Sequence, residues 1–290
     1  MEYLLIPLLG VLAASKSVVQ SRFAKGHTKT TANGVFFVAF VFLTCALLTI
    51  PSLFQGSVNG KFLLLSAIYG VTCLLFQFAY LQAFRYGSTP VSVLIATTAM
   101  VGPVVFSAIA YGEPFGAKEI IGLILILSTF VLNTQFKQDG EKKKTGLLWI
   151  VFISLTFLGN AGAMIVQKIF VKQMGAANTP TFVCYSYLIG TVLAFPLAFL
   201  LRHNSKEEKE PVKKPLLIAA FAVGAMLCVF QIVNNYALSK ISATILIPTY
   251  NCITSLFVAL ATALLFKEKM TKKQILSAVL SVGAILLMVL

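Results

Sequence analysis

Apolar stretches of about twenty residues alternate with short polar connectors along the whole chain. Twenty residues rising 1.5 Å each match the hydrocarbon thickness of a bilayer, so each stretch predicts a transmembrane helix. The connectors contain glycine, proline or charged residues, as at 25–29, 57–60 and 202–214. Residues 2–21 lack a signal-peptide pattern and are expected to form the first span. The predicted helices cover 2–21, 32–51, 62–84, 89–111, 118–136, 146–167, 180–201, 216–238, 242–265 and 271–290.

The chain contains an internal repeat. Residues 19–25 and 166–172, near the ends of the first and sixth predicted helices, are identical at four of seven positions. Further matches are Gln77 with Gln231, Ala83 with Ala237, Glu113 with Glu268, and Lys118 with Lys273. The chain is therefore expected to consist of two homologous halves.

These halves are predicted to be two five-helix repeats, 1–136 and 146–290, joined by a charged linker at 137–145. Five helices in each repeat require the second repeat to be inverted relative to the first. The expected fold class is thus an all-α membrane protein of ten transmembrane helices in two inverted five-helix repeats. Duplication without transport is the alternative explanation of this symmetry.

The amino-acid composition also indicates a membrane protein. Hydrophobic residues make up 58% of the 290 residues, charged residues only 11%, and the mean hydropathy is +0.91, which excludes an ordinary soluble domain. All Lys and Arg except Lys16 lie in or near predicted connectors, so the net charge of +14 suits anionic lipid headgroups better than nucleic acid. Most of them follow odd-numbered helices, which by the positive-inside rule places both termini outside.

Short motifs at the fourth and fifth helices resemble a known family. Gly112-Glu113 ends the fourth helix, Pro103 lies ten residues earlier, and Ile121-Gly122 opens the fifth helix. With the five-plus-five organisation, this is similar to the EamA-like branch of the drug/metabolite transporter superfamily. The resemblance implies an integral protein of a bacterial plasma membrane that transports by alternating access. It also implies a central cavity between helices 1, 3, 4, 6, 8 and 9. The second half departs from the pattern, because Lys267-Glu268 replaces Gly-Glu and Ser277 replaces the glycine.

Polar side chains within the predicted helices are the candidate substrate ligands, because such groups are costly in hydrocarbon unless they face a cavity or one another. On the eighth helix three amides are spaced i, i+3, i+4 and share one face. The functional interpretation is a wall that hydrogen-bonds a small polar metabolite, and the alternative is bonding between helices. The candidates are Lys16, Gln20, Gln77, Tyr80, Thr98, Asn160, Gln167, Gln231, Asn234, Asn235, Tyr250 and Asn251.

Lys16 is the one ionisable residue expected well inside a span. It is expected either to bind a substrate carboxylate or phosphate, or to extend its ammonium toward the nearer interface. Pro103 and Pro248 are candidate hinges, with ordinary structural kinks as the alternative. Glu113 and Glu268, beside Lys118 and Lys273, are interpreted as loop ion pairs or helix caps.

The sequence contains no pattern of a catalytic nucleophile, a phosphate-binding loop or a metal-ligand cluster, so we expect no enzyme activity, cofactor or metal. A missing intramembrane carboxylate disfavours cationic drugs and a carboxylate proton relay. The expected partners are a small-molecule substrate and the lipid bilayer, without nucleic acid. The substrate is expected to be a neutral, zwitterionic or anionic metabolite. The competing class is a non-transporting membrane protein, such as a lipid-modifying enzyme or an assembly scaffold.

Overall fold

The computed structural model describes residues 2–27, 30–54, 58–86, 96–133, 146–204, 214–266 and 272–289, and the predicted linker 137–145 lies outside them. In this part of the chain the secondary structure is helical, and each predicted span coincides wholly or partly with a helix. The elements are η1 (Glu2–Leu4), α1 (Leu5–His27), α2 (Thr31–Thr49), η2 (Ile50–Phe54), α3 (Gly60–Tyr86), α5 (Val101–Tyr111), α6 (Ala117–Asn133), α7 (Leu147–Met174), η3 (Ala176–Asn178), α8 (Thr179–Asn204), α9 (Lys214–Lys240), α10 (Ala243–Phe266) and α11 (Lys272–Val289).

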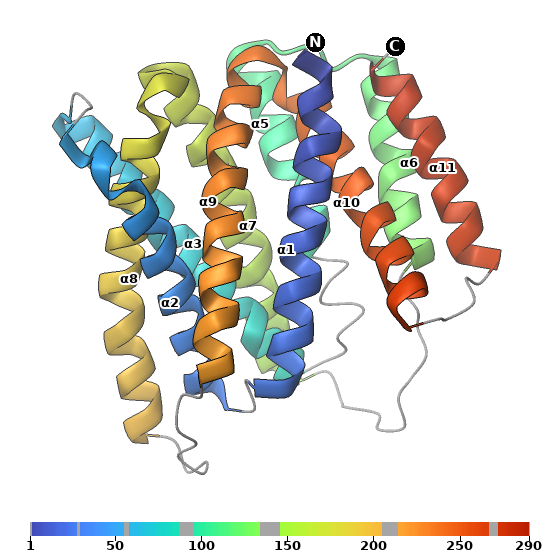
Figure 1. The fold of residues 1–290 in the computed structure, drawn as a ribbon. Helices are drawn as coiled ribbons and strands as arrows, with labels where there is room; N and C mark the ends of the chain where they lie inside the picture. Colours follow the sequence, from blue (N-terminus) through green and yellow to red (C-terminus); the bar gives the residue numbers. More distant parts are fainter. Residues whose placement is uncertain are drawn as a thin grey trace.

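Helix contacts occur in symmetry-related couples. α3 packs against α7 as α9 packs against α1, and α5 packs against α7 as α10 packs against α1. The equivalent helices α2 and α8 pack on each other, and so do α6 and α11. Both chain termini lie at one end of the bundle (Figure 1), here called the terminal end. This pattern is that of a pseudo-two-fold axis relating the repeats, whose helices interleave rather than forming two separate bodies.

Glycines permit the close approach of helices from different repeats. A Cβ atom on Gly70 of α3 would lie 2.4 Å from the carbonyl oxygen of Ser186 on α8. A Cβ atom on Gly224 of α9 would lie 2.7 Å from the carbonyl oxygen of Val41 on α2. Small residues at helix contacts are typical of membrane bundles, where packing replaces the hydrophobic effect as the main attraction between helices.

The outer surface is apolar. Large hydrophobic side chains are strongly exposed on several helices, for example Ile109, Val192 and Ile218 at 81%, 68% and 68%. Among the described residues, six stretches are long and apolar enough to cross a membrane: Glu2–Val19, Thr31–Phe54, Gly60–Ala83, Leu147–Met174, Ala176–Asn204 and Lys214–Lys240. An apolar exterior of this extent needs lipid as its solvent.

Two helices are longer than the sequence predicts, and one is interrupted. α1 continues to His27 and α7 to Met174, beyond the expected ends at 21 and 167. Polar residues there had indicated connectors, but a helix can extend past an apolar stretch when protein surrounds its polar turns, as it does at Lys168 of α7, which is 1% exposed. The predicted helix 89–111 is broken by a turn at Ala99 and Met100, after which α5 begins.

Candidate functional site

A network of four side chains lies inside the bundle, centred on Gln231 of α9. Its Oε1 atom accepts a hydrogen bond from Nε2 of Gln167 on α7 at 2.6 Å. Its own Nε2 atom donates to the hydroxyl oxygens of Tyr69 on α3 and Tyr187 on α8, at 2.7 and 2.9 Å. All four residues are buried. Two predicted ligands, Gln167 and Gln231, are thus brought together in a network that joins both repeats.

Sequence reasoning missed the two tyrosines of this network. Neither Tyr69 nor Tyr187 was among the candidate ligands. The available signal is the phenolic hydroxyl, which needs a hydrogen-bond partner when a tyrosine is buried within a membrane span. A tyrosine in an apolar helix therefore predicts a polar neighbour on another helix.

Two further predicted ligands are buried without full pairing. Asn235 is 0% exposed, and within the described part of the chain neither its Oδ1 nor its Nδ2 atom has a hydrogen-bond partner. Asn234 is 2% exposed, and its Oδ1 atom is likewise without a partner there. An unpaired buried polar group costs about 1–3 kcal/mol. Asn235 therefore lowers the stability of the fold, and both of its polar atoms remain able to form hydrogen bonds.

Lys16 and Gln77 line a small cavity between the repeats. Its other lining residues are apolar side chains of α2 and α9. The ammonium nitrogen of Lys16 lies 5.5 Å from the ring centroid of Phe230, within cation–π range. The rings of Phe230 and Tyr250 lie edge to face, with centroids 5.7 Å apart. The predicted ligand Tyr250 is therefore beside the ring that Lys16 contacts.

The remaining predicted ligands have other surroundings. Asn160 donates from Nδ2 to the carbonyl oxygen of Ala96 at 3.0 Å, and so holds α7 to the segment that precedes α5. Asn251 donates to the carbonyl oxygen of Ile247 one turn earlier in its own helix. Tyr80 is half-buried and stacks on Phe76, Thr98 is half-buried before the helix break, and the side chain of Gln20 lies outside those described.

The two candidate hinge prolines occupy different settings. Pro103 lies in the first turn of α5, directly after the break at Ala99 and Met100, where its missing N–H removes no established helical bond. Pro248 lies inside the continuous helix α10. The fourth predicted helix is thus already divided beside its proline, whereas its counterpart in the second repeat is not.

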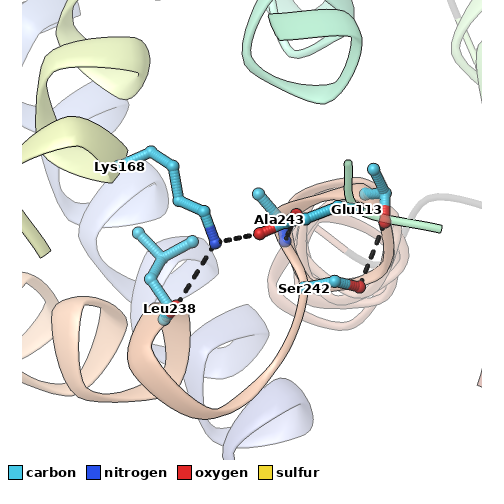
Figure 2. A network of polar contacts seen from close by, with 6 residues as sticks. Glu113, Lys168, Leu238, Ser242 and Ala243 are labelled. Carbon is cyan, nitrogen blue, oxygen red and sulfur yellow. Dashed lines mark hydrogen bonds and ion pairs between the residues drawn. The ribbon is translucent and has the colours of Figure 1, made fainter. Parts of the chain in front are cut away.

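A buried ion pair joins the repeats at the terminal end, and it corrects the sequence interpretation of Glu113 and Lys168. Figure 2 shows Lys168 of α7 reaching Glu113, which follows α5; the Nζ–Oε1 distance is 2.5 Å, and the side chains are 1% and 9% exposed. The sequence analysis placed Lys168 just past the end of its predicted helix and interpreted Glu113, beside Lys118, as a loop ion pair or a helix cap. The structure pairs Glu113 with Lys168 across the bundle, and Lys168 lies inside α7, which continues to Met174.

The same pair connects to two helix ends. The Nζ atom of Lys168 donates to the carbonyl oxygen of Leu238 in the last turn of α9 at 3.4 Å. The Oε2 atom of Glu113 accepts from the backbone N–H of Ala243, the first residue of α10, at 2.6 Å. A cation at a helix C-terminus and an anion at a helix N-terminus both complement the helix dipole. The pair is therefore well compensated.

Local backbone geometry places Glu113. Gly112 ends α5 in the left-handed conformation, with φ 61°, and its N–H bonds to the carbonyl oxygen of Ser107. A residue with a Cβ atom is strained there, so glycine permits the turn that directs the following glutamate across the bundle. This gives a physical reason for the Gly-Glu pair. The equivalent Glu268 lies outside the described residues.

Taken together, the interleaved inverted repeats, the apolar exterior and the polar interior define a polytopic helical membrane protein of the transporter type. The sequence model of the EamA-like transporter family matches residues 1–135 and, separately, 146–290. The chain therefore belongs to the EamA-like transporter family, and the predicted resemblance and fold class are confirmed.

Other comparisons bear on the fold alone. No curated protein sequence matches the chain significantly. A solved structure described only as the crystal structure of a protein is similar, with a TM-score of 0.77 and 14% sequence identity over 98% of this chain and 96% of the other. At that identity the likeness extends to the arrangement of helices and no further.

Proposed function

We propose that this protein is a secondary transporter that moves a small polar metabolite across a bacterial plasma membrane by alternating access. Its family is a family of transporters, which also argues against a lipid-modifying enzyme or a scaffold. The observation that carries the proposal is Asn235, a fully buried amide whose two polar atoms have no partner among the described residues. A scaffold gains nothing from such a cost, whereas a solute that bonds this amide offsets it.

The paired helix contacts support alternating access. Because the repeats interleave through equivalent contacts, an exchange of their conformations would open one end of the bundle while closing the other. In the conformation described here, Glu113 and Lys168 hold the repeats together at the terminal end. We propose that this ion pair is the closing contact of that end and separates when the end opens.

The repeats differ in sequence at the positions that would form the equivalent contact at the opposite end. Ser21 aligns with Lys168, so the second repeat's Glu268 cannot form the same ion pair with that position. The two ends are thus expected to open with different free energies, even though the repeats are homologous. This asymmetry gives the transporter a preferred resting conformation.

Transport from reconstituted liposomes tests the function. Liposomes with the purified protein are loaded with a defined mixture of sugars, nucleosides, amino acids and organic acids, and mass spectrometry follows which compounds leave. At least one should leave faster than from protein-free liposomes, and Asn235→Leu should slow it roughly tenfold or more, the worth of one lost hydrogen bond to a polar solute.

Tyr236→Leu is the matched control, since Tyr236 is the next residue of α9 and is 49% exposed on the outer face. It should transport at the wild-type rate. If no compound leaves faster than from empty liposomes, the proposed function is wrong. If Asn235→Leu transports as well as the control, Asn235 does not contact the solute.

A further inference from the structure

Lys16 is a cation in the interior of the bundle. It is the central residue of α1, eleven residues from either end of that helix. The ring that its ammonium contacts belongs to Phe230, which lies about 24 Å along α9 from Lys214 and about 15 Å from Lys240, at 1.5 Å per residue. The charge is therefore deep in the bundle rather than at an interface.

The direction of the side chain argues against snorkelling. The sequence predicts that the first span ends at residue 21, five residues after Lys16, so the nearer interface lies toward the C-terminal end of α1. Helical side chains lean toward the N-terminus of their helix, which for Lys16 is the direction away from that interface, and its ammonium lies 5.5 Å from the ring centroid of Phe230, ten residues before the end of α9. We therefore expect the ammonium to point away from the interface that snorkelling would use.

No described carboxylate compensates this charge. Among the described residues, the buried carboxylate of Glu113 is bound to Lys168 at the terminal end. The contact with Phe230 gives a modest cation–π attraction, and Gln77 adds an amide to the same cavity. An ammonium group held in a low-dielectric site needs a counter-charge, which the described part of the protein does not provide.

We infer that Lys16 binds the anionic group of the transported substrate, so that the substrate class is a metabolite with a carboxylate or a phosphate. The inference rests on the proposed transport function and names the substrate class of its site. Gln77 supplies a hydrogen bond beside the anion, and the ring of Phe230 lies against the ammonium. In the conformation described here the cavity holds about one water molecule, so a metabolite enters it only after the repeats separate.

Binding to matched pairs of compounds tests the inference. The probes are glucose 6-phosphate with glucose, glycerol 3-phosphate with glycerol, uridine monophosphate with uridine, lactate with lactamide, and succinate with succinamide. Thermal stability of the detergent-purified full chain is measured at increasing concentrations of each, which gives apparent affinities. At least one anion should stabilise the wild-type protein while its neutral counterpart does not.

Three variants assign the effect to Lys16. Lys16→Met should weaken binding of that anion roughly 10–100-fold, the range expected for a lost charge-assisted hydrogen bond. Lys16→Arg should retain part of the affinity. Lys240→Met, which removes an exposed lysine at the end of α9, should bind like the wild type.

Two binding results would overturn the inference. One is that no anion of the panel stabilises the protein; the other is that anion binding is unchanged in Lys16→Met. Failure of the proposed function looks different, because no compound, charged or neutral, would then leave the loaded liposomes. Transport of neutral compounds at equal rates by wild type and Lys16→Met would leave the function intact and refute the anionic substrate.

Discussion

Lys16 and Lys168 lie on equivalent helices, α1 and α7, yet their surroundings are opposite. Lys168 has a carboxylate partner and a carbonyl acceptor, and its side chain is 1% exposed. Lys16 contacts an aromatic ring and lines a cavity, without a carboxylate partner in the described part of the chain. The comparison indicates that the two lysines have different roles: Lys168 holds the terminal end closed, and Lys16 is available to bind a ligand.

Removing Lys168 should have the largest effect on stability. Lys168→Met leaves the Glu113 carboxylate buried without its cation, and breaking one side of a buried pair costs about 3–5 kcal/mol. Denaturant unfolding of the purified protein in detergent measures this loss. Lys240→Met is the control and should change stability by less than about 0.5 kcal/mol. Equal stabilities of the two variants would mean that the ion pair contributes nothing.

Glu113→Gln should cost less, about 1–3 kcal/mol. The amide oxygen can still accept the hydrogen bond from Ala243, so the cap of α10 survives while the charge is lost. The double variant Glu113→Gln with Lys168→Met should be more stable than the sum of the single losses predicts, since neither charge remains uncompensated. Strict additivity in the same unfolding measurement would show that the two residues are not coupled.

Substitution in the uncharged network around Gln231 should cost less stability than loss of the ion pair. Gln231→Leu deprives Gln167, Tyr69 and Tyr187 of hydrogen bonds, and such bonds in membrane proteins average about 0.6 kcal/mol each. We expect a loss of about 1–2 kcal/mol in the unfolding experiment. A loss as large as that of Lys168→Met would mean that the network, rather than the ion pair, is the main polar contact between the repeats.

The fold was largely predictable from the sequence, because spanning length and hydropathy determine where a helix can cross a bilayer. The helix ends were harder. The predicted span ended at Gln167 and so placed Lys168 in a connector. Only the tertiary structure shows that α7 includes Lys168 and continues to Met174.

The site was predictable only in part. Gln167 and Gln231 were candidates because amides are rare in hydrocarbon, and they do meet. Glu113 meets Ala243 across 130 residues of sequence, and no local pattern contains that partnership. The sequence analysis therefore overstated the absence of carboxylates from the interior. Glu113 comes from a loop, yet its side chain is only 9% exposed.

The melting temperatures of Lys16→Met and Lys168→Met, measured without added solutes in the same detergent, test the central contrast most directly. Lys16→Met removes a charge that has no described carboxylate partner, so its melting temperature should equal or exceed that of the wild type. Lys168→Met should melt several degrees lower, because it strands Glu113. If Lys16→Met melts as low as Lys168→Met, Lys16 has a structural partner within the protein, and the assignment of its charge to the substrate is contradicted.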